Sequence, residues 1–160
     1  MKKISLSQGK FALVDDKDYP FLIKWKWYAH KSRNGFVAFR SLKSHERKLG
    51  VTMLMHRVIM DCPEGKEVDH KDFNTLNNQR SNLRVCSTSQ NCQNRRKSAV
   101  NTSGYKGVVL DKRYNKWVTR IKKDRKMIYL GSFKDKEVAA LVYDNAARQI
   151  HGEFAKLNFA

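Results

Sequence analysis

A carboxylate and an imidazole stand side by side at Asp69-His70, in a stretch that is otherwise dense in carboxamides. An imidazole is the side chain whose ordinary pKa suits the removal of a proton from water near neutral pH. A carboxylate is a hard oxygen ligand of the kind that Mg²⁺ prefers. The pair therefore indicates metal-assisted hydrolysis, in which a cation offsets the charge of the group that is attacked.

Short elements must position this pair. Glu67-Val68 is typical of a short strand that the pair directly follows, and Leu83–Val85 predicts a second strand after a polar loop. Ser87 with Gln90 three residues later is a capping-box signature, so a helix that carries Asn91 in its first turns is expected here. Because so many carboxamides leave little apolar surface to bury, something other than a core must account for the composition.

The stretch from Val68 to Arg96 resembles the HNH nuclease motif of the ββα-metal type. Asp69-His70 matches the first element of that motif, Asn82 the second and Asn91 the third. Asn82 comes twelve positions after His70, and Asn91 comes nine positions after Asn82, which are the spacings of phage and intron homing endonucleases. The alternative is a solvated polar loop with an incidental histidine, and the agreement of four positions favours the nuclease.

The resemblance implies a role for each of these residues. His70 is expected to be the general base, and Asn82 to hold the loop so that the imidazole points correctly. Asp69 and Asn91 are expected to bind one divalent metal, Mg²⁺ first and Mn²⁺ as the alternative. Two neighbouring carboxamides could be mistaken for these residues, and the spacing disfavours both: Asn78 and Asn94.

The last segment of the chain predicts a different arrangement. Three short strands joined by polar turns are expected at Tyr105–Leu110, Lys116–Lys122 and Met127–Leu130. Asp135 can cap a helix from about Lys136 to His151, with Gly152 just beyond its end. Period-2 alternation places Trp117, Thr119 and Ile121 on the face toward this helix, and Val118, Arg120 and Lys122 on the outward face.

Residues 103–159 resemble an APETALA/ethylene-response-factor DNA-binding domain. The blocks that carry the likeness come in the right order: Tyr105–Val108, Trp117–Ile121, Tyr129–Phe133, Ala139-Ala140, Tyr143–Ala147 and Leu157–Phe159. In that family a three-stranded sheet enters the major groove of DNA and the helix backs it. The likeness departs from the plant pattern at Val109, where an arginine usually reads bases, and at Arg120, where an acidic residue is common, so a target sequence does not carry over.

The second resemblance also implies DNA contacts. Alignment with the family places them at Lys106, Arg120, Lys122 and Tyr129. Turns and strand ends add phosphate contacts at Lys112, Arg113 and Arg125, and the end of the motif adds Arg95 and Arg96. A solvated basic sheet is the alternative.

The charge of the chain favours a polyanionic partner. The 160 residues carry a net charge of +18. Residues 95–160 hold 16 Lys and Arg against six Asp and Glu, a net +10, and the remainder, 17 against nine, has a net +8. Because the excess is spread over both parts and is not a basic tail, a polyanion touched along the whole molecule is the expected partner, and the two resemblances imply that it is double-stranded DNA.

Several classes of protein are disfavoured. The three cysteines, Cys62, Cys86 and Cys92, form no C-x-x-C pair, so neither a structural zinc nor a disulfide framework is expected. No apolar run reaches membrane length and no signal core follows Met1. We expect no membrane association and no small-molecule cofactor, and a reduced protein in the cytoplasm of a bacterium or a phage-infected cell.

The N-terminal region is expected to be rich in β-structure. Ile4–Leu6 and Phe11–Val14 flank a Gln8-Gly9 turn, Tyr19-Pro20 favours a short helix, and Ser32–Gly35 predicts a hairpin turn before a strand over residues 36–42.

Two further features of this region have more than one interpretation. An aromatic cluster, Trp25, Trp27 and Tyr28, fits a core better than base stacking. Met53–Met60 is apolar at helical spacing, with His56-Arg57 on its other side. That pair suits a phosphate contact, solvent exposure or a structural hydrogen bond equally.

The sequence as a whole predicts an α+β protein with two domains. An HNH nuclease domain over residues 1–96, β-rich over 1–60 with the ββα-metal motif over 66–96, is followed by a basic linker over 97–103 and a DNA-binding domain over 104–160. The expected activity is site-directed cleavage of duplex DNA by a monomer that nicks one strand. An inactive DNA-binding regulator is the main alternative. A third hypothesis is an unspecific nuclease, which would hardly need an additional sheet that recognises a DNA sequence.

Overall fold

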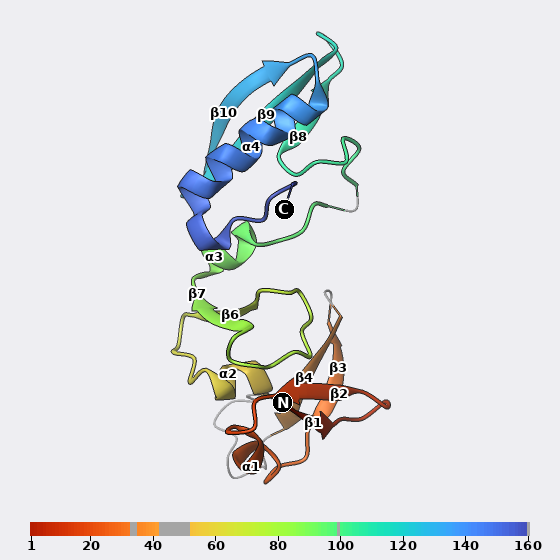
Figure 1. The fold of residues 1–160 in the computed structure, drawn as a ribbon, viewed down its shortest axis with the longest axis vertical. Helices are drawn as coiled ribbons and strands as arrows, with labels where there is room; N and C mark the ends of the chain where they lie inside the picture. Colours follow the sequence, from red (N-terminus) through yellow and green to blue (C-terminus); the bar gives the residue numbers. More distant parts are fainter. Residues whose placement is uncertain (33–34, 42–51, 99, 160) are drawn as a thin grey trace. The chain divides into compact units, whose positions relative to one another are not determined.

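The structure, a computed structural model, describes residues 1–32, 35–41, 52–98 and 100–159. The chain folds as two compact units, Met1–Thr88 and Ser89–Ala160 (Figure 1). Both units combine short helices or one long helix with small antiparallel sheets, which confirms the predicted α+β class.

The first unit begins with the predicted hairpin. Strand β1 (Lys2–Ser5) pairs antiparallel with β2 (Phe11–Val14). The turn between them contains Gly9 at φ +63°, a conformation that glycine adopts without a steric penalty. Helix α1 (Tyr19–Leu22) follows with its proline in the first turn, as expected, because proline has no N–H to leave unsatisfied there.

A three-stranded sheet follows in the same unit. Strand β4 (Gly35–Ser41) lies between β3 (Tyr28–Ser32) and β5 (Thr52–Leu54). The central residues of the turn predicted at Ser32–Gly35, and the last residue of the strand predicted over 36–42, lie outside the described residues. Helix α2 (Met55–Ile59) is shorter than the predicted 53–60, because Leu54 is extended (φ −90°, ψ 133°) and pairs with Phe39 of β4.

One apolar core joins these elements. It takes side chains from both sheets and both helices, including the fully buried Val14, Leu22 and Met55. Trp27 is only 2 % exposed, and its indole N–H donates to the Leu22 carbonyl at 2.9 Å. The interpretation of this aromatic residue as part of a core is therefore confirmed.

The two strands of the candidate motif form a sheet of their own in the first unit. Strand β6 (Glu67–His70) pairs antiparallel with β7 (Leu83–Cys86), with Asp69 opposite Arg84 and His70 opposite Leu83. The sequence placed the Asp-His pair just after the strand, and this was wrong, because both residues take part in the β6–β7 pairing. Helix α3 (Thr88–Gln93) follows directly after Ser87, as the capping-box pattern predicted.

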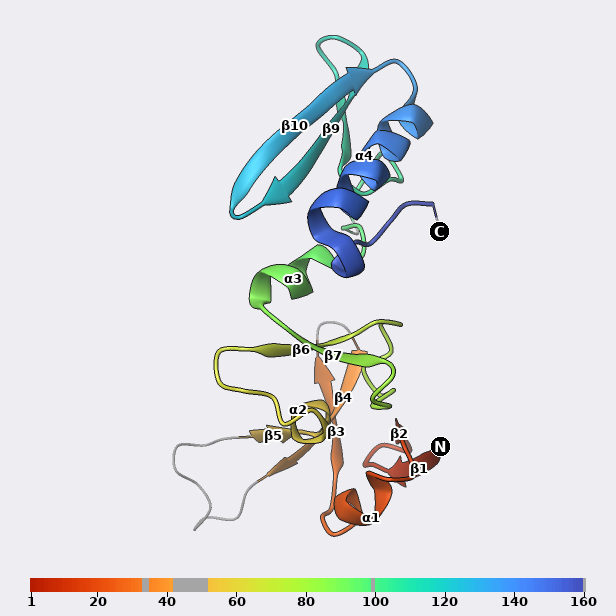
Figure 2. The same ribbon diagram turned by 60° about the vertical axis from the view of Figure 1, so that its left-hand side comes forward.

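The second unit holds a three-stranded antiparallel sheet in the order β10-β9-β8, made of β8 (Val108–Asp111), β9 (Lys116–Lys123) and β10 (Lys126–Phe133). Helix α4 (Lys136–His151) lies along one face of this sheet (Figure 2), and a short 3₁₀ turn, η2 (Gly152–Phe154), follows it. The predicted sheet with one backing helix is confirmed.

Small residues allow the helix to approach the sheet closely. Ala139, Ala140 and Ala147 of α4 are fully buried, and the Thr119 hydroxyl donates to the Ala139 carbonyl at 3.0 Å. Ile121 packs with Tyr143 and Ala147 of α4 in one apolar cluster. The alternation along β9 therefore predicted the inward face correctly.

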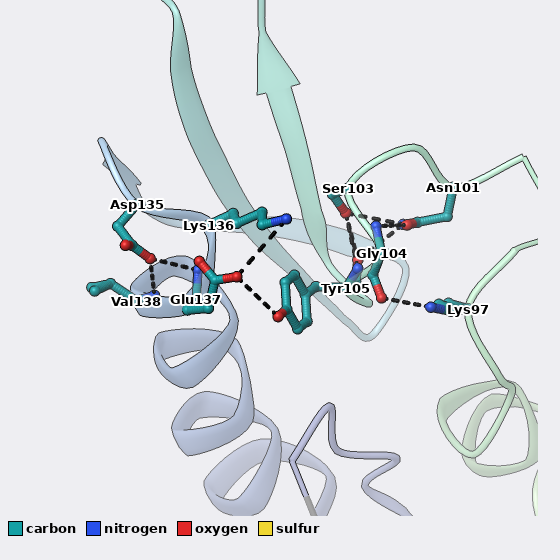
Figure 3. Close-up of polar contacts among 9 residues, drawn as sticks. All are labelled: Lys97, Asn101, Ser103, Gly104, Tyr105, Asp135, Lys136, Glu137 and Val138. Carbon is teal, nitrogen blue, oxygen red and sulfur yellow. Dashed lines mark hydrogen bonds and ion pairs between the residues drawn. The ribbon is translucent and has the colours of Figure 1, made fainter.

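The start of α4 is fixed by polar contacts (Figure 3). The carboxylate of Asp135 accepts hydrogen bonds from the backbone N–H groups of Glu137 and Val138, at 2.7 and 3.0 Å, which confirms the predicted cap. Tyr105 donates its hydroxyl to the Glu137 carboxylate at 3.2 Å. The first turn of the helix is thereby tied to the segment that leads into β8.

Figure 3 also shows contacts in the segment predicted as a linker. Lys97 donates to the Gly104 carbonyl at 2.7 Å, and the Ser103 hydroxyl oxygen lies within hydrogen-bonding distance of the carbonyl oxygens of Tyr105 and Val108, at 2.9 and 2.8 Å. Ser103 is only 5 % exposed. The end of this segment is thus held against the start of β8.

Two observations concern the chain as a whole. Within the ranges that the structure describes, no helix is long and apolar enough to cross a membrane. The three cysteines are free thiols, and burial raises the pKa of the Cys86 thiol to about 11.

Candidate functional site

His70, the residue predicted to act as general base, ends strand β6 and is only 6 % exposed. Its Nε2 lies 3.2 Å from the side-chain oxygen of Asn78. Burial lowers the pKa of His70 below its ordinary value, while the hydrogen bond to Asn78 opposes that shift. The imidazole is therefore neutral at physiological pH, which is the form that can accept a proton.

Asp69, the preceding residue, is also buried, and its carboxylate meets Arg84 of the paired strand. Arg84 donates from Nε at 2.9 Å and from Nη2 at 2.7 Å, both to Oδ2 of Asp69. The side chain of Asp69 is 7 % exposed and that of Arg84 is 12 % exposed. Because removing one partner of such a pair leaves a buried charge, Arg84 and Asp69 depend on each other for stability.

Asn82, the middle residue of the motif, ties together the loop between β6 and β7. Its side-chain oxygen accepts from the backbone N–H of Asp72 at 3.0 Å, and its Nδ2 donates to the Asp72 carboxylate at 2.9 Å and to the Asn77 carbonyl at 2.8 Å. Because both the oxygen and the nitrogen of the Asn82 carboxamide form hydrogen bonds within the loop, they hold its two ends together. Such bonds fit the expected role of Asn82 in holding the loop.

The N-terminal hairpin anchors the far side of this loop. The backbone of Leu13 in β2 accepts from the Asn78 N–H and donates to the Leu76 carbonyl, both at 2.8 Å. Asp15 accepts from the Arg80 N–H at 2.9 Å, and Asp18 forms an ion pair with the Arg80 guanidinium at 2.8 Å. The β-rich N-terminal part of the unit therefore supports the loop that contacts His70.

His56 and Arg57 of α2 have separate roles. His56 is 8 % exposed, and its ring meets the ring of His70 edge to face, with centroids 5.0 Å apart and planes at 80°. Burial lowers the pKa of His56 to about 3. Arg57 donates to the carbonyls of Lys66 and Pro63 at 2.6 and 3.2 Å. Of the three interpretations of this pair, the structural hydrogen bond holds for Arg57, and solvent exposure was wrong for His56.

Asn91, the second expected metal ligand, lies in α3, and its side chain is half-buried. Asn94, which the spacing disfavoured, is buried just after that helix. Across the described ranges, no group of three or more His, Cys, Asp or Glu side chains could hold a metal ion. One carboxylate with one carboxamide carbonyl nevertheless fits Mg²⁺ chemically, because this ion takes few protein oxygens and keeps several waters.

The outward face of the sheet in the second unit carries most of the predicted DNA contacts. Arg120 lies opposite Tyr129, and Lys122 lies opposite Met127. All four side chains are exposed, Tyr129 by 59 %. Val118 was expected on the same face, where it lines a hollow together with Val109 and Arg120, but it is only 9 % exposed.

The remaining predicted contacts are exposed as well, with one exception. Exposed side chains at turns and beyond α3 are those of Lys112, Arg113, Arg125, Arg95 and Arg96. Lys106 is different, because its ammonium group donates to the carbonyls of Gln93 and Arg95. Burial lowers the pKa of Lys106 to about 8. A contact between Lys106 and DNA would require it to leave these carbonyls.

Two residues beside His70 were not predicted for the site. Asn78 was set aside because its spacing does not match the motif, and His56 was placed on the polar side of a helix. The sequence does carry a signal for Asn78, namely the run of carboxamides after His70. A carboxamide that is fully buried, as Asn78 is, must form hydrogen bonds with its neighbours. A sequence offers no comparable signal for His56, since its contact depends on how α2 meets β6.

Known proteins resemble both parts of the chain. The HNH endonuclease family matches residues 54–93. A protein of Acanthamoeba polyphaga mimivirus described as an uncharacterized HNH endonuclease is 32% identical over 94% of this chain and 76% of its own length. Protein 3.8 of Escherichia phage T7 is 34% identical over 59% of this chain and 77% of its own length.

The second likeness covers less of the chain. An ethylene-responsive transcription factor of Arabidopsis thaliana is 47% identical over 34% of this chain and 31% of its own length. The similarity to the mimivirus protein extends over most of both chains and includes the candidate motif. The chain therefore belongs to the HNH endonucleases, a family of phosphodiester hydrolases, and part of it is homologous to ethylene-response-factor domains.

Proposed function

We propose that this protein is a site-directed DNA endonuclease of the homing type, with a ββα-metal active site and a C-terminal sheet that reads duplex DNA. The observation that carries the proposal is the neutral, buried imidazole of His70, bonded through one ring nitrogen and adjacent to the Asp69 carboxylate, in a chain of the HNH endonuclease family. A general base needs a lone pair held in a fixed direction, and this environment supports it.

In the proposed reaction His70 takes a proton from the attacking water, and Asn82 keeps the loop beside it closed through its bonds to Asp72 and Asn77. Asp69 and Asn91 are the proposed metal ligands. Mg²⁺ bound there would offset the negative charge on the scissile phosphate and on the leaving oxygen. Mn²⁺ is the alternative ion, since it accepts the same oxygen ligands.

The C-terminal sheet is proposed to dock the enzyme on DNA. Arg120, Lys122 and Tyr129 face outward from β9 and β10, where they can approach base edges. Lys112, Arg113 and Arg125 lie at turns and are suited to phosphates, whose attraction weakens as salt rises. A net charge of +18 supports a partner of this kind over the whole chain.

We further propose that the enzyme acts as a monomer and nicks one strand. The chain has one Asp-His…Asn…Asn set, and one such set acts on one phosphodiester at a time. The sequences of β8, β9 and β10 in the C-terminal sheet do not repeat one another, which suits an asymmetric DNA target better than a palindrome.

Supercoiled plasmid provides the test. With Mg²⁺ the protein should produce open circles well before linear molecules, and EDTA should stop the reaction. Labelling the ends of each strand separately on a cleaved fragment should show one cut strand and one intact strand. Binding without cleavage in Mg²⁺ or Mn²⁺ would contradict the proposed enzyme, and linear product without open circles, made by a dimer, would contradict the nicking monomer.

A further inference from the structure

Asn78 is a fully buried carboxamide in the loop between β6 and β7. Its backbone N–H donates to the Leu13 carbonyl at 2.8 Å, and the Leu13 N–H donates in turn to the Leu76 carbonyl. These bonds lie next to a parallel bridge between Leu13 and Asn77. The position of Asn78 is therefore set by a strand of the N-terminal hairpin, in addition to the loop itself.

The partners of the Asn78 side chain decide which of its ends faces His70. Its Nδ2 donates to the Leu76 carbonyl at 3.4 Å and to the sulfur of Met55 at 3.6 Å. Since both of these are acceptors, the amide nitrogen belongs on that side. The oxygen Oδ1 is then the atom that faces Nε2 of His70, at 3.2 Å.

An amide oxygen accepts hydrogen bonds and cannot donate them. Nε2 of His70 must therefore carry a hydrogen for this contact to be favourable. A neutral imidazole has one ring hydrogen, so Nδ1 of His70 keeps a lone pair. Which nitrogen is protonated is commonly set by the hydrogen bond that the other one makes, and here a buried side chain makes that bond.

The ring of His70 is also held from the side. His56 packs its ring against that of His70 at an interplanar angle of 80°, and Met55, its neighbour in α2, is the residue whose sulfur contacts Asn78. Within the described part of the chain, Nδ1 of His56 has no hydrogen-bond partner. The imidazole of His70 is thus restrained by a ring contact with His56 and by a hydrogen bond with Asn78.

Asn82 does not share this role directly. Its side chain bonds to Asp72 and Asn77, and among the described residues no hydrogen bond joins it to the imidazole. The two carboxamides differ in function, because Asn82 closes the loop and Asn78 contacts the ring.

We propose that Asn78 is a positioning residue of the nuclease reaction, which holds His70 in the tautomer protonated at Nε2 and so leaves Nδ1 to accept the proton of the attacking water. This inference rests on the proposed role of His70 as general base. Residues that orient metal-ligating side chains change activity by about 10- to 100-fold when they are replaced, and we expect an effect of the same order for a residue that orients the general base.

The tautomer can be observed directly in the wild-type protein. Nitrogen-15 NMR of the histidine rings in the full chain distinguishes a protonated from an unprotonated ring nitrogen, and His70→Ala identifies its signals by their loss. We expect Nε2 of His70 to be protonated and Nδ1 to be unprotonated. The opposite tautomer would overturn the proposal, whether or not any variant of Asn78 folds.

Two variants of Asn78 then test the loss of its acceptor oxygen separately from a change in the volume of its side chain. Asn78→Leu keeps a similar size and removes the oxygen, and it should slow single-turnover cleavage about 10- to 100-fold with unchanged DNA affinity. Asn78→Asp keeps an acceptor oxygen, and it should preserve the Nε2-protonated tautomer and recover most of the rate. Asn77→Leu is the matched control, since it removes the loop contact with Asp72 and should leave the tautomer unchanged.

The outcomes distinguish this inference from the function on which it rests. If His70→Ala cleaves DNA at the wild-type rate, the proposed function fails. If His70→Ala is inactive and Asn78→Leu cleaves at the wild-type rate, only the role of Asn78 fails. If Asn78→Leu does not fold, the wild-type tautomer and the Asn78→Asp rate decide the question.

Discussion

The two units of this protein place their polar side chains in opposite ways. In the first unit the candidate residues are buried, and Asp69, His70, Asn78 and Asn82 are all less than 9 % exposed. In the second unit the proposed base-reading residues Arg120, Lys122 and Tyr129 stand on an open sheet face, where Tyr129 is 59 % exposed. The apolar core of that unit lies on the other side of the sheet, against α4.

This difference follows from what each surface must do. A proton acceptor needs a fixed direction and a controlled pKa, and burial with complete hydrogen bonding supplies both. A surface that meets DNA needs reach and charge, and exposed side chains on a rigid sheet supply them. Substitutions in the first unit should therefore change rate and stability together, while those on the sheet face should change binding alone.

The largest effect is expected at His70. His70→Ala removes the proposed base, and cleavage should fall by about 10²- to 10⁴-fold, the usual contribution of general base catalysis. DNA affinity should stay at the wild-type level, because the exposed sheet of the second unit is unchanged. Single-turnover cleavage and a filter-binding assay on the same DNA would measure the two effects.

Asn82→Ala is the companion variant. It removes three hydrogen bonds of the loop, so stability should fall and the rate should fall less than in His70→Ala, because Asn82 does not react. A larger rate loss in Asn82→Ala than in His70→Ala would contradict the assignment of roles.

The second prediction tests whether the units fail separately. Gly107 has φ +79°, and a Cβ at this position would overlap the ring of Tyr143. Gly107→Ala should destabilise the second unit by about 1–3 kcal/mol for the backbone conformation and by a similar amount, about 1–3 kcal/mol, for overpacking. DNA affinity should drop, while the NMR signals of the His70 ring stay unchanged.

Gly104 provides a matched control for this experiment. It has nearly the same φ, +83°, but a Cβ there would meet nothing within 4 Å. Gly104→Ala should therefore show the conformational cost without the clash. Equal destabilisation by the two variants would mean that Tyr143 does not determine the cost at Gly107.

Local chemistry explains why some elements were predictable from the sequence. Helix α4 has the predicted bounds, because Asp135 caps it, Gly152 follows it and its alanines mark the packed face. Strand β8 starts later than predicted, at Val108, because Gly107 adopts a positive φ just before it. Strand β10 runs past its predicted end, to Phe133, and its pairing with β9 is irregular between Tyr129 and Gly131.

The surroundings of His70 were less predictable, for a physical reason. The motif spacing located Asp69, His70 and Asn82, which depend on residues close in the chain. Asn78 meets His70 only because Leu13 of a distant hairpin fixes its backbone. Contacts of this kind depend on tertiary pairing, and hydrophobic periodicity carries no information about them.

The third prediction concerns base reading by the sheet. Arg120 is exposed on β9 and lies opposite Tyr129. If it contacts a base edge, Arg120→Ala should cost about 1–3 kcal/mol of binding at the preferred site and relax sequence preference there. Selection of bound sequences from a random pool, with wild type and variant in parallel, would show this change. An unchanged preference would assign Arg120 to the phosphate backbone.

The smallest effect is expected at Lys112, which is exposed just after β8 and lines the hollow on the outer sheet face. A lysine at a turn is suited to a phosphate, and phosphates are the same in every sequence. Lys112→Ala should therefore weaken binding to all sequences alike, and the slope of log affinity against log salt should become shallower by about 0.9, the value for one lost phosphate contact. Measuring the salt dependence of binding to a preferred and an unrelated duplex tests both statements. A loss confined to the preferred duplex would instead make Lys112 a base-reading residue, and the division between reading from β9 and anchoring from the turns would then be wrong.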